Sequence, residues 1–183
     1  MKLVILDRDG VINADSSDYI KSPEEWIPLT GSLEAMARLS NAGYTIAILT
    51  NQSGLGRSYF DHETLMLIHE KLISAVARAG GEVDLIRYCP HHPEDGCDCR
   101  KPKPGLFHNL AKYYDTSLAG VFAVGDSLRD LQAAEAAGAS PILVKTGNGH
   151  KTLANPELDK NIPVVDDLGD FAEQLLSGEL DGH

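Results

Sequence analysis

Two carboxylates separated by a single residue end the first apolar run of the sequence. The run LVIL at residues 3–6 leads directly into Asp7, Arg8 and Asp9. A short apolar run that ends at a turn signal is typical of a strand buried on both faces. Because alternate side chains of a strand point the same way, we expect Asp7 and Asp9 to project together and Arg8 to project away. Two like charges so close repel unless a cation lies between them, so the pair indicates a metal site, with a solvated turn as the alternative.

Polar residues also follow or end three later apolar runs. Thr50 and Asn51 follow YTIAIL, Cys89 ends DLIRYC, and Asp126 follows VFAVG. Ligands of open parallel sheets bind outside the carboxyl ends of the strands. One such residue alone is usually a helix cap, but four strand ends with acid, hydroxyl, amide or thiol groups predict a binding site at this edge.

The carboxylates in this set suit a hard cation. Asp7, Asp9 and Asp126 offer the oxygen ligands that Mg²⁺ prefers. Such an ion, together with a lysine, can neutralise a phosphate group held against acidic walls. One carboxylate could then attack phosphorus while the second moves the proton of the leaving group. The residues therefore indicate phosphoryl-transfer chemistry.

Donors for a phosphate group are present near the same edge. Thr50 offers a hydroxyl, Asn51 an amide, and the backbone N–H groups of NQSGLGR an anion-binding nest. The segment CRKPKPG supplies Arg100, Lys101 and Lys103, and its prolines keep it extended. This is the densest basic run in a chain of formal net charge −11, which favours a phosphate-binding role over a solvated loop.

The three cysteines lie within eleven residues, in the segment CPHHPEDGCDC. An odd and tightly clustered set is a poor disulfide framework, and metal binding is the better interpretation. Cys89, His91, Cys97 and Cys99 form a C-x-H and a C-x-C pair that predict a closed, tetrahedral and structural Zn²⁺ site. His92 is the alternative nitrogen ligand, and reduced thiols in a surface loop are the alternative without metal.

The elements that must hold these groups alternate between strand and helix. Buried strands are predicted at 2–7, 44–51, 84–89, 120–126, 141–147 and 162–167, and helices at 32–43, 62–79, 105–114, 129–139 and 168–177. This alternation predicts an α/β fold, a Rossmann-like three-layer α/β/α sandwich around a mostly parallel sheet. The segment 13–30 is too short for a large cap domain. We expect one domain over residues 1–183, with a zinc loop at 89–99 inserted.

The composition limits the partners. The net charge of −11 argues against nucleic acid and anionic membranes, but not against a small phosphorylated substrate. No apolar run has membrane-spanning length and no signal-peptide pattern is present, so we expect a cytoplasmic protein. Nothing in the sequence indicates an extensive apolar interface, so we expect a monomer.

Four segments, in this order, resemble the motifs of the haloacid dehalogenase superfamily of phosphatases: DRDGV, LTNQSG, RKPKPG and VGDSLRD. The similarity runs over essentially the whole chain. It implies that Asp7 is the nucleophile that forms an aspartyl-phosphate, and that Asp9 is the general acid and then the general base. It also implies Mg²⁺ bound by Asp7, Asp126 and the Asp9 backbone carbonyl, with Thr50 and Lys101 on the transferring phosphoryl group.

Within that superfamily the segment CPHHP…CDCRKPKPG is similar to two families that carry such a zinc loop and lack a large cap. These are the D-glycero-D-manno-heptose-1,7-bisphosphate 7-phosphatases and the histidinol-phosphate phosphatases. TNQSGLGR and CRKPKPGLF resemble the heptose family more closely, which implies a sugar bisphosphate substrate from lipopolysaccharide heptose synthesis. Arg100, Asn51 and Arg57 would then contact the rest of the substrate. The short zinc loop is shared with the histidinol family, which stays the alternative.

A phosphoryl-accepting receiver module is a prediction of a different class. Receivers also place acids, a threonine and a lysine at the strand ends of an α/β sandwich, but their phosphoacceptor follows the third strand. Here the third strand ends in Cys89, which favours the enzyme. The segment TGNGHKT at 146–152 is expected to be a loop near the site, with His150 and Lys151 solvated.

Overall fold

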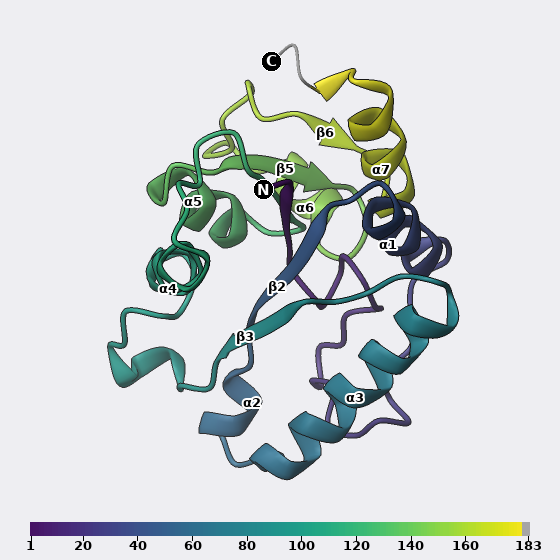
Figure 1. The fold of residues 1–183 in the computed structure, drawn as a ribbon. Coiled ribbons are helices and arrows are strands. Elements are labelled where there is room, and N and C mark those ends of the chain that lie inside the picture. Colours follow the sequence, from purple (N-terminus) through teal and green to yellow (C-terminus); the bar gives the residue numbers. More distant parts are fainter. Residues whose placement is uncertain (181–183) are drawn as a thin grey trace.

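Six parallel strands form the single sheet of the structure, a computed structural model that describes residues 1–180 (Figure 1). The strand order is β3-β2-β1-β4-β5-β6. The elements in chain order are β1 (Leu3–Leu6), α1 (Ser32–Asn41), β2 (Thr45–Asn51), α2 (Ser53–Gly56), α3 (His62–Arg78), β3 (Leu85–Cys89), the 3₁₀ helix η1 (Pro93–Asp95), α4 (Gly105–Tyr114), β4 (Phe122–Gly125), α5 (Leu128–Ala136), β5 (Ser140–Val144), α6 (Gly149–Leu153), β6 (Val164–Val165) and α7 (Leu168–Ser177). The predicted α/β fold without a cap domain is confirmed for the described residues.

Strand β1 lies in the middle of the sheet and is buried on both faces, as its apolar run predicts. Val4 and Leu6 pack into the larger hydrophobic core on one side of the sheet. Leu3 and Ile5 pack into a second core on the other side. This alternation is the two-residue period of a strand, and it fixes the direction in which the chain leaves β1 at the carboxyl edge.

Helices cover both faces of the sheet (Figure 1). α1, α3 and α7 supply Met36, Ile68 and Phe171 to the larger core. α4 and α5 supply Phe107 and Ala133 to the second core. The three layers of the predicted sandwich are therefore present, and both faces of the parallel sheet are covered as such sheets require.

Ser32 is a possible N-cap from the sequence, because it directly precedes the first apolar residue of the helix, but the structure does not use it as one. Gly31, in the left-handed region at φ 78°, occupies the capping position, and no side chain caps α1. The Ser32 hydroxyl lies instead near two backbone carbonyls and donates to Ile12 O at 2.7 Å or Leu29 O at 2.9 Å. Ser32 therefore ties the end of the loop that follows β1 to the start of the helix.

Three short helical segments lie where the sequence predicts loops. α2 has four residues, α6 has five and η1 has three. A helix of one turn shows no apolar period, so periodicity cannot reveal it. All three lie at the carboxyl edge of the sheet or in the predicted zinc loop, so they matter for the site.

The loop that joins β1 to α1 is anchored in the core. Trp26 is almost completely buried, and Ile20 is buried beside it in the larger core. Lys71 of α3 donates to the backbone carbonyls of Pro23 at 2.5 Å and Trp26 at 2.9 Å. This anchoring holds residues 15–19 at the rim of the cleft described below.

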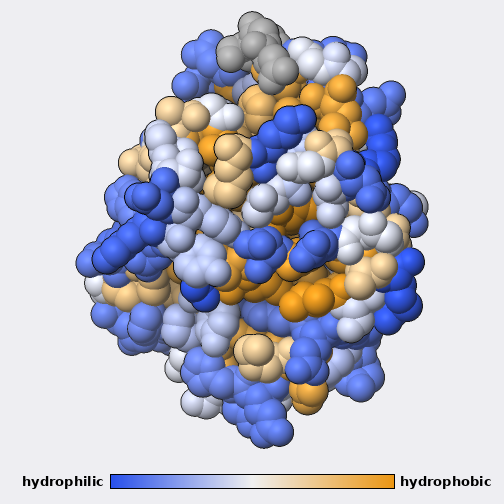
Figure 2. Space-filling model, viewed as in Figure 1, coloured by the Kyte–Doolittle hydropathy of each residue, from blue (hydrophilic) through white to orange (hydrophobic). Residues whose placement is uncertain are grey.

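The face of the molecule seen in Figure 2 carries both hydrophilic and hydrophobic residues. Most residues along the outline of this view are hydrophilic, and hydrophobic residues show nearer its middle. None of the helices in residues 1–180 combines the length and the apolar character that crossing a bilayer requires.

Candidate active site and metal centre

A cleft of about 370 Å³ lies at the carboxyl edge of the sheet, a volume in the range of small-molecule sites. It brings together eight of the residues that the sequence predicts for magnesium binding, catalysis and substrate contact, but not Lys103, which is half exposed and donates to the Cys97 carbonyl at 2.8 Å. These residues are Asp7, Asp9, Thr50, Asn51, Arg57, Arg100, Lys101 and Asp126. Their roles stay predictions, but their juxtaposition is a property of the fold.

Three carboxylates, two of them buried and Asp7 partly exposed, form a cluster in this cleft, named here the carboxylate cluster: Asp7, Asp126 and Asp130. Each offers an oxygen, and these oxygens lie within 4.8 Å of one another. Burial and the charge of Asp130 raise the pKa of Asp7 to about 7. Burial and the charge of Asp7 raise the pKa of Asp126 to about 8. A divalent cation would offset this repulsion, so the oxygen donors fit Mg²⁺.

The Asp9 carboxylate is not part of the carboxylate cluster, although the sequence predicts its side chain as a ligand of the same cation. Arg8, Asn13 and Gln52 donate hydrogen bonds to it. Asp130, which the sequence marks only as part of a motif, completes the cluster instead. The expectation that Arg8 projects away is wrong as well, because its buried guanidinium turns back onto Asp9. Metal binding by the Asp9 backbone carbonyl stays a prediction.

Lys101 links the carboxylate cluster to the sheet. Its ammonium group donates to Asp7 Oδ1 at 2.9 Å and to the Leu49 carbonyl at 2.8 Å, and it lies 2.7 Å from Asp130 Oδ1. These three contacts match the three donors of an ammonium group. Burial lowers the pKa of Lys101, but the carboxylates of Asp130 and Asp7 outweigh it and raise the pKa above its usual range. Lys101 is therefore a fixed positive charge.

The first turn of α5 holds Asp130 in place. Its Oδ2 accepts hydrogen bonds from the Ser127 backbone N–H at 3.0 Å and from the Ser127 hydroxyl. A side chain at Gly125 would place its Cβ 2.3 Å from the Cβ of Asp130, so glycine is needed where β4 ends. Glycine at position 125 therefore lets the first turn of α5, with Asp130, lie close to the end of β4.

Residues 146–152, which follow β5, hold Asp126 in place, and this gives the segment a structural role next to the site. The Asn148 backbone N–H and side-chain amide donate to Asp126 Oδ2 at 2.7 and 3.1 Å. The Thr152 hydroxyl donates to the Asp126 carbonyl at 2.8 Å. His150 and Lys151 are exposed, as predicted. Sequence reasoning missed Asn148, because nothing in its local pattern indicates a partner 22 residues earlier.

Asn51 and Thr50 are held by their neighbours in the cleft. The Asn51 side chain accepts from the Lys101 backbone N–H and donates to the Lys101 carbonyl, both at 3.1 Å. The Thr50 hydroxyl oxygen accepts from Gln52 Nε2 at 2.9 Å. Asn51 thus fixes the loop that carries Lys101, a role beyond the substrate contact predicted for it.

Three arginines line the same cleft: Arg57, Arg100 and Arg129. Arg57 Nε and Arg100 Nη1 are buried and have no hydrogen-bond partner among the described residues. Burial and the charge of Arg129 lower the pKa of Arg100. Buried guanidinium donors without partners, near further positive charge, fit an anionic group of a ligand. The sequence singled out two of these arginines and missed Arg129.

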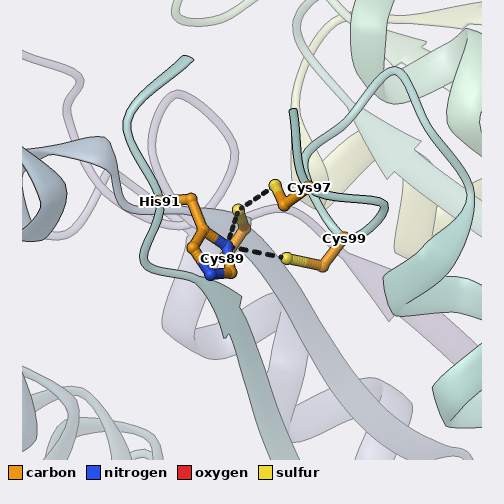
Figure 3. Close-up of side chains that lie close together, drawn as sticks. All are labelled: Cys89, His91, Cys97 and Cys99. Atoms are coloured by element: carbon orange, nitrogen blue, oxygen red, sulfur yellow. Dashed lines mark hydrogen bonds between the residues drawn. The ribbon is translucent and has the colours of Figure 1, made fainter. Parts of the chain in front are cut away.

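The four predicted zinc ligands lie together in the zinc loop, residues 89–99 (Figure 3). Cys89 Sγ lies 3.6 Å from Cys97 Sγ and 3.5 Å from His91 Nδ1, and Cys99 Sγ lies 3.2 Å from His91 Nδ1. Thiolates bound tetrahedrally to one zinc ion at about 2.3 Å lie about 3.8 Å apart, so the cluster fits zinc. It is too open for a disulfide, whose sulfur atoms lie about 2 Å apart.

Of the two histidines of the zinc loop, the structure places His91 with the cysteines and His92 outside the group. His92 accepts a hydrogen bond from the Glu94 backbone N–H and caps η1, so its ring is used outside the cluster. His91 points into the cluster. Burial raises the pKa of the Cys89 thiol to about 12, so a cation is needed to hold it as a thiolate.

Comparison with known proteins places this arrangement in a family. Residues 98–171 match the HAD-hydrolase-like family model. The D-glycero-β-D-manno-heptose-1,7-bisphosphate 7-phosphatase of Bordetella bronchiseptica is 59% identical over 176 residues, which are 96% of this chain and 98% of that protein. The chain belongs to the haloacid dehalogenase-like phosphatases. The phosphatase of the same name from Pseudomonas aeruginosa is 55% identical, over 95% of this chain and 97% of its own.

Solved structures agree with this assignment. The crystal structure of the D,D-heptose 1,7-bisphosphate phosphatase from B. bronchiseptica, complexed with magnesium and phosphate, matches this phosphatase with a TM-score of 0.95 over 97% of this chain and 99% of that one. The enzyme of that name from Burkholderia thailandensis matches with a TM-score of 0.78 at 45% identity, over 97% and 99% of the two chains.

Loss of one thiol should remove zinc from this phosphatase. We expect about one zinc ion per chain in protein purified without chelator, also after Mg²⁺ is removed. Cys97→Ala should lose it, lower the melting temperature and lower kcat/KM about 10–100-fold, because Arg100 and Lys101 directly follow Cys99. Metal analysis and thermal melting measure this, with the exposed neighbour Asp98→Ala as control. A wild-type protein without zinc would contradict the prediction.

Metal-free protein should lose stability as the pH rises from about 4 to about 8. The pKa values of Asp7 and Asp126 are about 7 and 8 in the folded state, above their ordinary value of 3.8, so the stability that their protonation carries is fully present below 3.8 and is lost as the pH rises through the folded-state values. Burial lowers the pKa of His69 to about 3, which costs stability only below its ordinary value of 6.5. Mg²⁺ should therefore raise the melting temperature more at the upper pH. An equal rise at both pH values would contradict this account.

Proposed function

We propose that this phosphatase removes the 7-phosphate of D-glycero-β-D-manno-heptose 1,7-bisphosphate in a reaction that depends on Mg²⁺. The observation that carries the proposal is one cleft with two kinds of anion site. The carboxylate cluster with Lys101 suits a metal-bound phosphoryl group that reacts, and Arg57, Arg100 and Arg129 suit a second phosphate that does not. The names of the relatives support this substrate, including the β anomer.

In the proposed reaction Asp7 and Asp9 act on opposite sides of the phosphorus atom. An oxygen of Asp7 attacks phosphorus and the bond from phosphorus to the sugar oxygen breaks. Asp9, which starts the reaction in its protonated form, gives that oxygen its proton. A water molecule then attacks the aspartyl-phosphate and gives a proton to Asp9, which releases phosphate and restores Asp7. Thr50 donates to one phosphoryl oxygen, Lys101 exchanges its hydrogen bond to Asp7 for one to another, and Mg²⁺ held by Asp7 and Asp126 would neutralise their charge.

The zinc loop has a structural role in this proposal. Cys89, His91, Cys97 and Cys99 fill all four positions of a tetrahedral site, so no position stays open for a reacting water. One domain over residues 1–183, a monomer and a cytoplasmic location stay predictions from the sequence.

The test compares phosphate release from the two anomers of heptose 1,7-bisphosphate and from histidinol phosphate, in the presence of Mg²⁺. We expect the highest kcat/KM with the β anomer. Arg57→Gln should raise KM for the bisphosphate and leave KM for heptose 7-phosphate unchanged, because only the bisphosphate carries the second anion. A preference for histidinol phosphate would overturn the substrate and leave the phosphatase chemistry in place.

A further inference from the structure

A completely buried arginine lies directly behind Asp9. Arg8 has a side-chain exposure of 0%, whereas Asp9 lines the cleft and is 21% exposed. Arg8 donates to Asp9 Oδ1 from Nε at 3.1 Å and from Nη2 at 2.9 Å, and Nη2 also lies 3.1 Å from Oδ2. A paired guanidinium contact of this kind fixes the plane of a carboxylate as well as its position.

The other end of this guanidinium contacts a buried histidine of α3. Arg8 Nη1 lies 3.3 Å from His69 Nε2, and His69 is 3% exposed. Because arginine has no acceptor, Nε2 must accept this hydrogen bond, and the proton of the neutral ring is on Nδ1. Burial and the charge of Arg8 lower the pKa of His69 to about 3, so the ring stays neutral.

Because the His69 ring that accepts from Arg8 is neutral, it does not compete with Asp9 for the positive charge. A second carboxylate at the place of His69 would share the positive charge and compete with Asp9 for the guanidinium group. Imidazole accepts the hydrogen bond from Nη1 without charge, so the Arg8 donors Nε and Nη2 remain directed at Asp9. The remaining donors to Asp9 are neutral as well: the Asn13 amide, 2.9 Å from Oδ1, and the Gln52 amide, 2.9 Å from Oδ2.

Arg8 does not contact the cleft. It is absent from the lining, and its donors Nε, Nη1 and Nη2 face Asp9 and His69. Any effect of Arg8 on the reaction must therefore pass through Asp9. The group that Asp9 serves in the proposed function is the leaving sugar oxygen, whose proton transfer depends strongly on the position of the acid.

We propose that Arg8, supported by His69, is a positioning residue that holds the Asp9 carboxylate in the orientation needed for proton transfer to the leaving group. The inference rests on the proposed function, in which Asp9 is the general acid. It assigns a task to two buried residues that neither bind substrate nor metal.

The test uses two substrates that differ in the need for that proton. A sugar phosphate has an alkoxide leaving group and needs the acid, whereas p-nitrophenyl phosphate has a stable phenolate leaving group and does not. The quantity compared is kcat/KM, because it covers the steps up to release of the leaving group and not the later hydrolysis of the aspartyl-phosphate, in which both substrates share Asp9 as base. Arg8→Lys should lower kcat/KM for the sugar phosphate on the order of 10²-fold and kcat/KM for p-nitrophenyl phosphate less than about 10-fold. The dissociation constant of the sugar phosphate should change little, because Arg8 does not touch the substrate.

Two substitutions of His69 test the same inference if the Arg8→Lys protein does not fold. His69→Gln retains a side-chain acceptor for Arg8 Nη1 and should stay near wild type. His69→Leu removes the acceptor and should show the same selective loss on the sugar phosphate, about 10-fold. If kcat/KM falls by the same factor for both substrates, Arg8 and His69 have a merely structural role and the proposal is overturned.

Asp9→Asn separates failure of this inference from failure of the proposed function. It should show the selective loss most strongly. If Asp9→Asn is selective and the Arg8 and His69 variants are not, the positioning role is wrong and the general acid stands. If Asp9→Asn itself affects both substrates equally, the acid assignment is wrong and the positioning role is overturned with it.

Discussion

Asp7→Asn should give a folded protein whose kcat for heptose 1,7-bisphosphate is at least about 10⁴-fold lower than that of the wild type. The amide cannot attack phosphorus, so the covalent step proposed for Asp7 is lost. Its oxygen can still accept the hydrogen bond that Lys101 donates at 2.9 Å, so the surrounding contacts are retained. Steady-state phosphate release measures the effect.

The same variant should lose activity but gain thermal stability when no metal is bound. Asp7 repels Asp126 and Asp130 in the metal-free cluster, so removing its charge should raise the melting temperature of metal-free protein near pH 8. Glu173→Gln, an exposed change on α7 with the same loss of charge, is the matched control and should alter neither property. Unchanged turnover in Asp7→Asn would exclude Asp7 as the nucleophile.

Lys101→Met should destabilise the fold by about 3–5 kcal/mol and lower kcat by on the order of 10²–10³-fold. The change removes the cation that lies 2.9 Å from Asp7 and 2.7 Å from Asp130, and leaves those two carboxylates buried and repelling each other. Methionine has a similar length, so lost packing is small. Urea unfolding and steady-state kinetics measure the two effects.

The control lies two residues further along the chain. Lys103 is half exposed, and its pairing with the exposed Asp98 is worth about 0–1 kcal/mol, so Lys103→Met should have little effect. Without Lys101 the pKa values of Asp7 and Asp130 rise, so these carboxyl groups become protonated and neutral at a higher pH. The loss of unfolding free energy in Lys101→Met should therefore become smaller as the pH falls. Equal destabilisation by both substitutions would contradict a central role of Lys101 in the cluster.

The sequence by itself determined the fold and the chemical type of the site. Apolar runs such as residues 3–6 reveal strands buried on both faces, because a strand between two helical layers has no polar face. The four zinc ligands lie within eleven residues, so their spacing alone limits the geometry that they can form. Asp7 and Asp126 follow strand ends and Thr50 lies in the last residues of β2, and parallel strands bring such residues to one edge.

Only the tertiary structure decided which groups touch. Lys101 reaches Asp7 over 94 residues of sequence, and Asn148 reaches Asp126 over 22. Arg8 turns toward Asp9 because β1 ends at Leu6, so the alternation that predicts the opposite direction no longer applies, and because His69 of α3 offers Arg8 a buried acceptor. Periodicity and spacing describe one element at a time. Contacts between elements depend on how the helices pack on the sheet, and this packing selected Asp130, Asn148 and His69 as the neighbours of the predicted site.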